Sequence, residues 1–356
     1  KECMVESTVL VAGSYDGALL GFSVEVAQDS SPSSTPLFAF SAHAGCIKAV
    51  GAGGDLLVTG GTDHTIAVYN VRKKREYGKL LQQDGGGTLN CLRFFGSSHL
   101  LSAGDEGELC IWRTSDWECL LRMKGHRGAV LDIAIHPTGR MALSVAADSK
   151  LMLWNLLTGK CNYTYTLPQP SSLVRWTPTG NGYVVGTNAA FILFGLDGSA
   201  ERRFCQAQGR QLCAAFATNE LFASGGNDGA LHVWDMKQPD EHGAPSNYSS
   251  LQGAHPARVK ALECVSAGVV ASASTNGEIK LWRIHRHDER PSAIQLLLTI
   301  PTRLRLTALG VSVIGDRSRP QQATKRAKAP TLACNGPAEA RSASAGEVGV
   351  PALVSQ

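Results

Sequence analysis

Seven short apolar segments of this chain each end in an aromatic residue, with a small polar or acidic residue six positions earlier. Successive aromatics lie 40 to 48 residues apart. A period of about 40–45 residues that ends in Trp-Asp is typical of WD-repeat β-propellers. The spacing therefore predicts an all-β, seven-bladed propeller, although 356 residues would otherwise suggest two or three domains. The seven pairs are Asp16/Phe22, Asp63/Tyr69, Glu106/Trp112, Asp148/Trp154, Asn188/Phe194, Asp228/Trp234 and Asn276/Trp282.

The fourth unit shows the internal pattern that the others share. Residues 130–136 alternate apolar and polar side chains, as expected for a half-buried strand. Residues 136–139 (His-Pro-Thr-Gly) predict a turn, because proline and glycine favour turn geometry. Residues 143–147 and 151–154 then form a second and a third strand around a tight turn. Each unit is thus predicted as three strands joined by short turns.

The two ends of the repeat region complement each other. Residues 9–22 resemble the second half of a unit, whereas residues 306–313 resemble a first half with nothing after it. Pairing of these segments would close the ring and remove exposed sheet edges. Two polar stretches, residues 27–36 and 238–250, are interpreted as insertions that lengthen the links between units.

Charge divides the chain into two parts. The +4 excess of the whole sequence is contributed by residues 317–356, which are rich in Ala, Ser and Pro and poor in aromatics. Such a composition cannot bury a core, so this tail is predicted to be disordered and mildly basic. The predicted domains are therefore residues 1–316, the propeller, and residues 317–356, the tail.

Composition argues against several classes of site. No apolar run approaches the ~20 residues of a membrane span, so no membrane partner is expected. The ten cysteines are scattered without a CxxC pair, which predicts reduced core residues of a cytosolic or nuclear protein and no metal site. Glycine-rich pieces such as residues 84–87 lack the Lys-Ser/Thr of a phosphate loop. We therefore expect no cofactor, no small-molecule substrate and no enzymatic activity.

Polar residues recur at fixed places in several units. Histidines precede three units, and in WD repeats such a histidine bonds the turn aspartate, next to a Ser or Thr and the aromatic. A hydrolase triad is the other interpretation, but a set that occurs three times is better explained as an internal tie for a buried turn. Units three, five and six lack this histidine and are expected to be less rigid. The predicted structural residues are His43, Asp63, Tyr69, Trp112, His126, Ser144, Asp148, Trp154, Asp228, Trp234, His255 and Trp282.

Basic residues are the candidates for partner contact. Four consecutive cations at residues 72–75 would make a local positive surface on a body of neutral formal charge. They are either an ordinary solvated loop or a contact for an acidic surface or a phosphate backbone. The full set of candidates is Arg72, Lys73, Lys74, Arg75, Arg283, Arg286, Arg303, Arg305 and the tail residues Lys325, Arg326 and Lys328.

Particular motifs, beyond the repeat itself, are similar to those of the p21-activated-kinase-interacting WD-repeat protein family. The resemblance extends over about residues 9–313, most of the chain. Residues 117–120 (Trp-Glu-Cys-Leu) and the closing segment 305–311 are its more specific parts. The other motifs are at residues 11–15, 20–22, 58–63, 91–94, 110–112, 135–139, 142–145, 154–156, 175–178 and 183–185.

The resemblance implies a non-enzymatic scaffold in the nucleolus that helps to assemble the large ribosomal subunit. Its implied partners are ribosomal proteins, assembly factors of pre-large-subunit particles and rRNA. A second implied role is a signalling adaptor that binds and restrains a p21-activated kinase. Other adaptor roles, such as a substrate receptor of a ubiquitin ligase, remain a further alternative.

Overall fold

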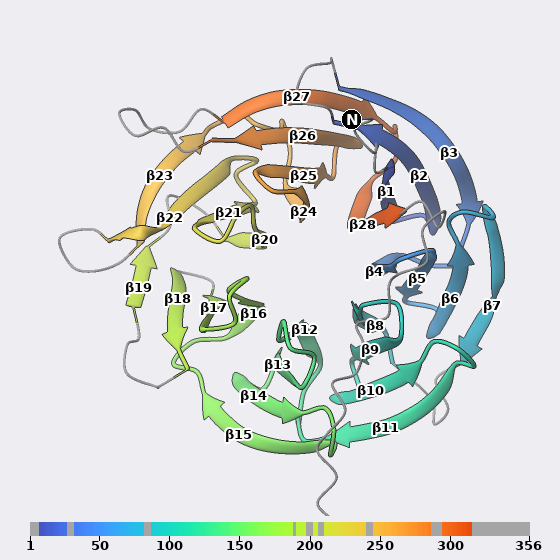
Figure 1. The fold of residues 1–356 in the computed structure, drawn as a ribbon, viewed down its shortest axis with the longest axis vertical. Coiled ribbons are helices and arrows are strands. Elements are labelled where there is room, and N and C mark those ends of the chain that lie inside the picture. The colour runs from blue at the N-terminus through green and yellow to red at the C-terminus, as the bar shows by residue number, and fades with distance from the viewer. Residues whose placement is uncertain are drawn as a thin grey trace, which may run out of the picture. The chain divides into compact units, whose positions relative to one another are not determined.

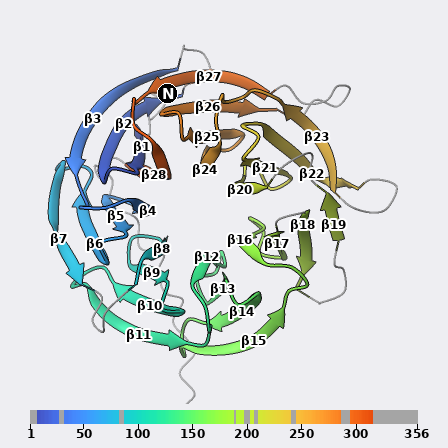
Figure 2. The same cartoon turned by 180° about the vertical axis from the view of Figure 1, so that it is seen from behind.

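The computed structural model describes residues 7–26, 32–81, 87–187, 190–196, 202–205, 210–239, 245–285 and 294–314. These residues form seven four-stranded antiparallel sheets arranged as blades around a common axis (Figures 1 and 2). The fold is thus the seven-bladed propeller that the repeat spacing predicts. Within the part of the chain that the structure describes, no helix is long and apolar enough to cross a membrane. The predicted boundary at residues 316/317 lies outside the described residues and stays a prediction.

The blades are numbered here by the order of their aromatics, and their strands run from the axis outward. Blade 1 contains β28 (Leu306–Ile314), β1 (Ser7–Ser14), β2 (Ala18–Glu25) and β3 (Ser33–Ser41). Blade 2 contains β4 (Ile47–Gly53), β5 (Leu56–Gly61), β6 (Thr65–Asn70) and β7 (Arg75–Leu81), and blade 3 contains β8 (Leu89–Phe95), β9 (His99–Gly104), β10 (Glu108–Arg113) and β11 (Glu118–Lys124). Blade 4 contains β12 (Val130–Ile135), β13 (Met141–Ala146), β14 (Lys150–Asn155) and β15 (Lys160–Thr166).

The remaining three blades follow the same arrangement. Blade 5 contains β16 (Ser171–Trp176), β17 (Gly182–Thr187), β18 (Ala190–Gly195) and β19 (Arg202–Cys205). Blade 6 contains β20 (Gln211–Phe216), β21 (Leu221–Gly226), β22 (Leu231–Pro239) and β23 (Pro245–Leu251). Blade 7 contains β24 (Val259–Ser266), β25 (Val269–Ser274), β26 (Glu278–Ile284) and β27 (Ile294–Pro301).

Ring closure occurs in blade 1, where the predicted half-units pair. Strand β28 lies antiparallel to β1, with Leu10 opposite Val311, and forms the innermost strand of that sheet (Figure 1). The Thr307 hydroxyl donates to the carbonyl oxygen of Ile47 at 2.6 Å, so the closing strand is also tied to blade 2. Closure by N- and C-terminal strands is thus confirmed.

A fourth, outer strand in each blade is the main feature that the pattern of three strands per unit missed. The interpretation of residues 27–36 as an insertion was wrong in part, because Ser33–Pro36 belong to β3 and pair with β2. Likewise, residues 245–250 form most of β23 rather than a link. An outer strand faces solvent and therefore need not carry the apolar alternation by which strands are recognised.

The hydrophobic core lies between neighbouring blades. One cluster joins Leu101 and Leu109 of blade 3 with Ile133, Met152 and Trp154 of blade 4, all of them buried. Burial of such side chains at about 25 cal/mol per Å² is the main force that holds blade to blade. Trp154, the recurring aromatic of its repeat, thus acts as an inter-blade packing residue.

Of the seven cysteines whose side chains the structure describes, four are core residues as predicted, Cys119 is half-buried and two are exposed. The prediction for Cys3, Cys205 and Cys334 lies outside the described side chains. Cys46, Cys91, Cys110 and Cys213 are buried free thiols. Cys161 and Cys264, by contrast, are exposed. Cys161 lies in outer strand β15, which is exposed at all but one of its residues. Cys264 lies in inner strand β24, where exposed and buried residues are interspersed, so an apolar neighbourhood in sequence did not ensure burial.

Candidate functional site: the two faces of the propeller

The strand ends define two faces of the ring. On one face, the backbone N–H of His43 donates to the carbonyl oxygen of Gly17, and the His43 ring lies 2.8 Å from Asp63. The turns that carry the recurrent His and Asp residues therefore lie on this face. We call it the histidine face. Strand β6 runs from there to the opposite face, where Arg72 contacts Asp55 at 3.3 Å.

Blade 4 contains the complete polar tie. His126 Nε2 lies 2.7 Å from Ser144 Oγ, and the Trp154 indole N–H donates to the same hydroxyl oxygen at 2.8 Å. Both carboxylate oxygens of Asp148 lie 3.2 Å from His126 Nδ1. With the imidazole proton on Nδ1, every group is satisfied: Nδ1–H donates to Asp148, and the Ser144 hydroxyl donates to Nε2. Since Ser144 is fully buried and already engaged by Trp154, it is unsuited to act as a nucleophile.

The environment of the tie keeps its histidine neutral and its aspartate ionised. Burial lowers the pKa of His126, and the nearby Asp148 only partly offsets this effect. Burial alone would raise the pKa of Asp148, but hydrogen bonds from the Arg127 backbone and from His126 hold it below its ordinary value. The pair is thus a hydrogen-bonded carboxylate and a neutral imidazole at neutral pH.

Blades 2 and 7 contain variants of the same arrangement. In blade 2, His43 Nε2 lies 2.8 Å from the Thr59 hydroxyl. In blade 7, the Ser272 hydroxyl lies 2.7 Å from His255 Nε2 and accepts from the Trp282 indole at 2.8 Å.

The residue that lies near the histidine ring in blade 7 is not the expected turn residue. Glu278, not Asn276, lies 3.8 Å from His255 Nδ1. Burial, followed by the charge of Lys280, lowers the pKa of His255 to about 4.

Blades 3 and 6 keep the indole–serine bond without a preceding histidine. Trp112 donates to Ser102 at 2.8 Å, and Trp234 donates to Ser224 at 3.2 Å. In blade 6, however, His232 within strand β22 lies 3.1 Å from Asp228. Unit six thus lacks a preceding histidine, as expected, but it has another histidine bonded to its turn aspartate, which the search for histidines ahead of each unit missed. The available signal was a histidine within an apolar strand, four residues after that aspartate.

The basic turn of blade 2 is exposed on the opposite face. The turn between β6 and β7 carries Arg72, Lys73 and Lys74, and Arg75 is the first residue of β7. All four are exposed. The guanidinium of Arg75 lies 5.4 Å from the centre of the Tyr77 ring, and Lys73 Nζ lies 6.0 Å from it. Cations near an exposed aromatic ring form a compact positive surface with one stacking group.

The other predicted basic residues are not brought to this turn. Arg303 and Arg305 precede β28 on the histidine face, where the Tyr15 backbone N–H donates to the carbonyl oxygen of Arg305 at 2.8 Å. The Arg305 guanidinium stacks 4.8 Å over the Tyr15 ring. Arg283 is half-buried near the end of β26, the counterpart of β6. The predicted residues outside the described part of the chain are Arg286, Lys325, Arg326 and Lys328.

Sequence reasoning missed a charged network inside the ring. Arg93 Nη1 donates to Glu263 Oε1 at 3.1 Å, although β8 and β24 belong to blades 3 and 7. Arg93 also lies 3.6 Å from Asp132, which in turn pairs with Arg175 of blade 5. The signal was a single charged residue in the middle of an apolar inner strand, as at Arg93 in Cys-Leu-Arg-Phe.

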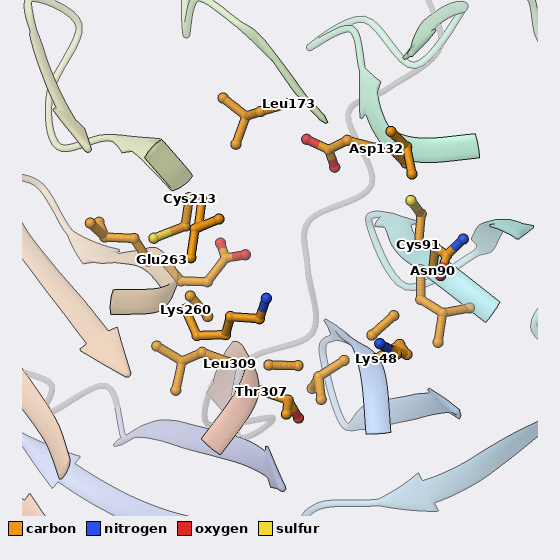
Figure 3. Close-up of a pocket in the computed structure, with 18 of the residues that line it drawn as sticks. Lys48, Asn90, Cys91, Asp132, Leu173, Cys213, Lys260, Glu263, Thr307 and Leu309 are labelled. Carbon is orange, nitrogen blue, oxygen red and sulfur yellow. The ribbon is translucent and has the colours of Figure 1, made fainter. Parts of the chain in front are cut away.

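A cavity of about 130 Å³ lies at the centre of the ring, where the inner strands converge (Figure 3). Its lining includes Lys48, Asn90, Asp132, Lys260 and Glu263, which Figure 3 shows around a common space. Within the described residues, no group of three or more His, Cys, Asp and Glu side chains is suited to hold a metal ion.

Comparison with known proteins agrees with this architecture. The WD domain, G-beta repeat model matches residues 34–70 and 117–155. A zebrafish (Danio rerio) protein named p21-activated protein kinase-interacting protein 1-like is 35% identical over 323 residues, covering 88% of this chain and 84% of that protein. The chain belongs to the p21-activated protein kinase-interacting protein 1 family.

Two further proteins are similar to this chain at lower sequence identity. Protein MAK11 of Saccharomyces cerevisiae is 27% identical over 261 residues, covering 64% of this chain and 63% of that protein. A solved structure described as "Structure of U3-55K" has a TM-score of 0.66 at 17% identity, covering 74% of this chain and 84% of that one, which shows a shared fold. As a WD-repeat member of this family, the chain is a scaffold built to offer surfaces to other molecules.

Proposed function

We propose that this protein is a non-enzymatic assembly factor that acts in the nucleolus during maturation of the large ribosomal subunit. Its partners would be ribosomal proteins, other assembly factors and precursor rRNA. This role is supported by membership of the p21-activated protein kinase-interacting protein 1 family, for which the sequence motifs imply a part in ribosome assembly. The observation that carries an RNA contact is the exposed basic turn at Arg72–Arg75, in a body whose formal charge, with this turn included, is neutral.

The chemistry of that turn suits a phosphate backbone. Lys73, Lys74 and Arg75 project from one tight turn, and Lys74 adopts a left-handed backbone with φ of 50°. Tyr77 is 44% exposed and would offer a stacking surface to a base beside the neutralised phosphates. Such a contact would be weakened strongly by salt, because counterions are released on binding.

Affinity purification at moderate salt tests the proposal. The tagged chain should recover large-subunit assembly factors together with precursor rRNA. The double variant Lys73→Glu/Arg75→Glu should lose rRNA, whereas Arg140→Glu/Lys160→Glu, exposed residues at the equivalent end of blade 4, should retain it. Failure to find the protein in any pre-ribosomal particle would reject the assembly role. Equal rRNA recovery by both variants would reject only the basic turn as the contact.

A signalling adaptor that binds a p21-activated kinase is the second candidate. It is favoured by the name of the zebrafish relative, a p21-activated protein kinase-interacting protein. Purified protein should then bind the regulatory segment of such a kinase directly. No binding between the two purified proteins would count heavily against this role.

A further inference from the structure

The mouth of the central cavity on the histidine face carries four exposed cations. Lys48 and Lys260 are the second residues of inner strands β4 and β24, and both line the cavity (Figure 3). Arg258 directly precedes β24 and Arg210 directly precedes β20. Their carbonyl oxygens accept from the backbone N–H groups of Thr275 and Asn227, which places both arginines at the turns of the histidine face.

These cations lack the side-chain partners that the turn carboxylates of that face have. Asp63 is engaged by His43, Asp148 by His126 and Asp228 by His232. Within the described part of the chain, Lys48, Lys260, Arg210 and Arg258 form no ion pair. Partial desolvation at the rim of the cavity, followed by the charge of Lys48, lowers the pKa of Lys260, and the charges of Arg258 and Arg210 act in the same direction. The mouth is therefore a site of mutually repelling positive charge.

Deeper in the cavity, the charges are balanced. The salt bridge between Arg93 and Glu263 spans the ring, and Asp132 pairs with Arg175 beside it. Two arginines thus face two carboxylates and form a neutral floor below the mouth. An incoming anion would meet uncompensated charge only at the level of Lys48 and Lys260.

We propose that this mouth binds an acidic segment of a partner protein. One carboxylate enters between Lys48 and Lys260, while Arg210 and Arg258 contact neighbouring carboxylates of the same segment. This interaction is independent of the assembly role proposed above and lies on the face opposite the basic turn.

The shape of the site favours a carboxylate side chain over a nucleic acid. A volume of about 130 Å³ accommodates the end of one side chain, and apolar groups such as Leu173 and Leu309 line it along with the charges. Single-stranded nucleic acid instead needs cations that track a backbone together with aromatic platforms for successive bases. Here the cations converge on one opening, so charge complementarity with a short acidic peptide is the better fit.

A binding measurement with defined probes tests this site. Fluorescence anisotropy of a labelled ten-residue glutamate peptide and of a labelled ten-nucleotide uridine RNA is measured with the full chain at low and moderate salt. The peptide should bind to the wild type, and Lys48→Glu/Lys260→Glu should weaken its affinity by at least about tenfold. The control Lys73→Glu/Arg75→Glu, which changes charge by the same amount on the opposite face, should leave peptide affinity unchanged. Because all four residues are exposed, thermal melting should match the wild type for both variants.

Each outcome decides the proposal. Loss of peptide binding in the cavity variant alone supports it. Equal loss in both variants would mean that net charge, not the mouth, holds the peptide, and no binding to the wild type would reject the site. If Lys48→Glu/Lys260→Glu removes RNA binding and leaves peptide binding intact, the mouth is a phosphate site and the proposal fails.

Discussion

Blades 4 and 5 lie side by side in the ring but are held by different interactions. Blade 4 ties its own turn internally through His126, Ser144, Asp148 and Trp154. In blade 5, Phe194 occupies the position of the tryptophan and cannot donate a hydrogen bond.

Aromatic packing takes the place of the tie in blade 5. The Tyr183 and Phe194 rings stack at 5.1 Å, and Trp176 meets Tyr183 edge-on at 5.4 Å. The Trp176 indole N–H donates across the blade boundary to the carbonyl oxygen of Ala134 in blade 4, at 3.0 Å. The indole N–H of blade 5 thus bonds to the neighbouring blade, whereas the indole N–H of blade 4 bonds within its own blade.

This difference shows that a propeller does not need the same tie in every blade. Ring closure makes each blade a neighbour of two others, so a blade without the internal network can be held by adjacent ones. Variants that act on one blade at a time should distinguish a blade held by its internal tie from a blade held by its neighbours.

The largest effect is expected for Trp154→Ala. Loss of a fully buried indole and of its bond to Ser144 should lower the free energy of unfolding by about 3–5 kcal/mol. Phe194→Ala, at the equivalent and only half-buried position of blade 5, should cost clearly less. Urea denaturation measures both, and equal losses would break the distinction between the blades.

Ser144→Ala should have the next largest effect. It leaves the Trp154 indole and His126 Nε2 buried without partners, at a cost of about 2–3 kcal/mol. The comparison in blade 5 is Ser171→Ala, at a buried serine that takes no part in a histidine tie. The Ser171 hydroxyl bonds the carbonyl oxygens of Gly186 and Leu173 and accepts from the Leu173 N–H. Its loss should lower the free energy of unfolding by about 1 kcal/mol. A smaller cost for Ser144→Ala than for Ser171→Ala, by the same denaturation assay, would contradict the tie.

Acid should weaken the blades with a histidine tie. Because the folded-state pKa of His255 is about 4, below the ordinary value of about 6.5, the unfolded chain takes up the proton first as pH falls. The free energy of unfolding should therefore fall by about 2 kcal/mol between pH 7 and pH 5 from this residue. His126, whose pKa is also lowered, adds in the same direction.

Substitution of His255 tests this dependence. His255→Asn should flatten the loss of stability between pH 7 and pH 5, whereas His64→Asn, at an exposed turn residue, should not. Hydrogen exchange at pH 5 should locate the early opening in blades 4 and 7. Early opening in blade 5 instead would reverse the comparison.

The smallest effect is expected at the boundary of the two blades. Trp176→Phe removes the bond to Ala134 but keeps most of the packing, at a cost of about 1 kcal/mol. Trp154→Phe removes the corresponding bond inside blade 4. Hydrogen exchange should show the first variant loosening blade 5 and the second loosening blade 4, and exchange confined to blade 4 in both would disprove the dependence of blade 5.

The residue pattern alone was sufficient for the number of blades, the pairing of the chain ends and the histidines that precede units. The number of blades and the histidine ties repeat at a fixed period or join residues within about 30 positions, as His126 does with Ser144, Asp148 and Trp154. The ends are far apart in sequence, but each supplies one half of the same repeat, so their pairing follows from the repeat pattern. The outer strands, such as β3 and β23, were not predicted because their solvent-facing side chains show no alternation of apolar and polar residues. The role of His232 was not predicted because this residue lies within strand β22, after the turn aspartate that it contacts, and does not precede the unit.

Only the closed ring decided what lies at its centre. Arg93 and Glu263 are separated by 170 positions in sequence, yet ring closure brings them to 3.1 Å. Lys48 and Lys260 likewise reach one cavity from strands that are distant in the chain. Periodicity records how each repeat folds, because that depends on neighbours in sequence, whereas the meeting of side chains across the axis depends on the curvature that all seven blades create together.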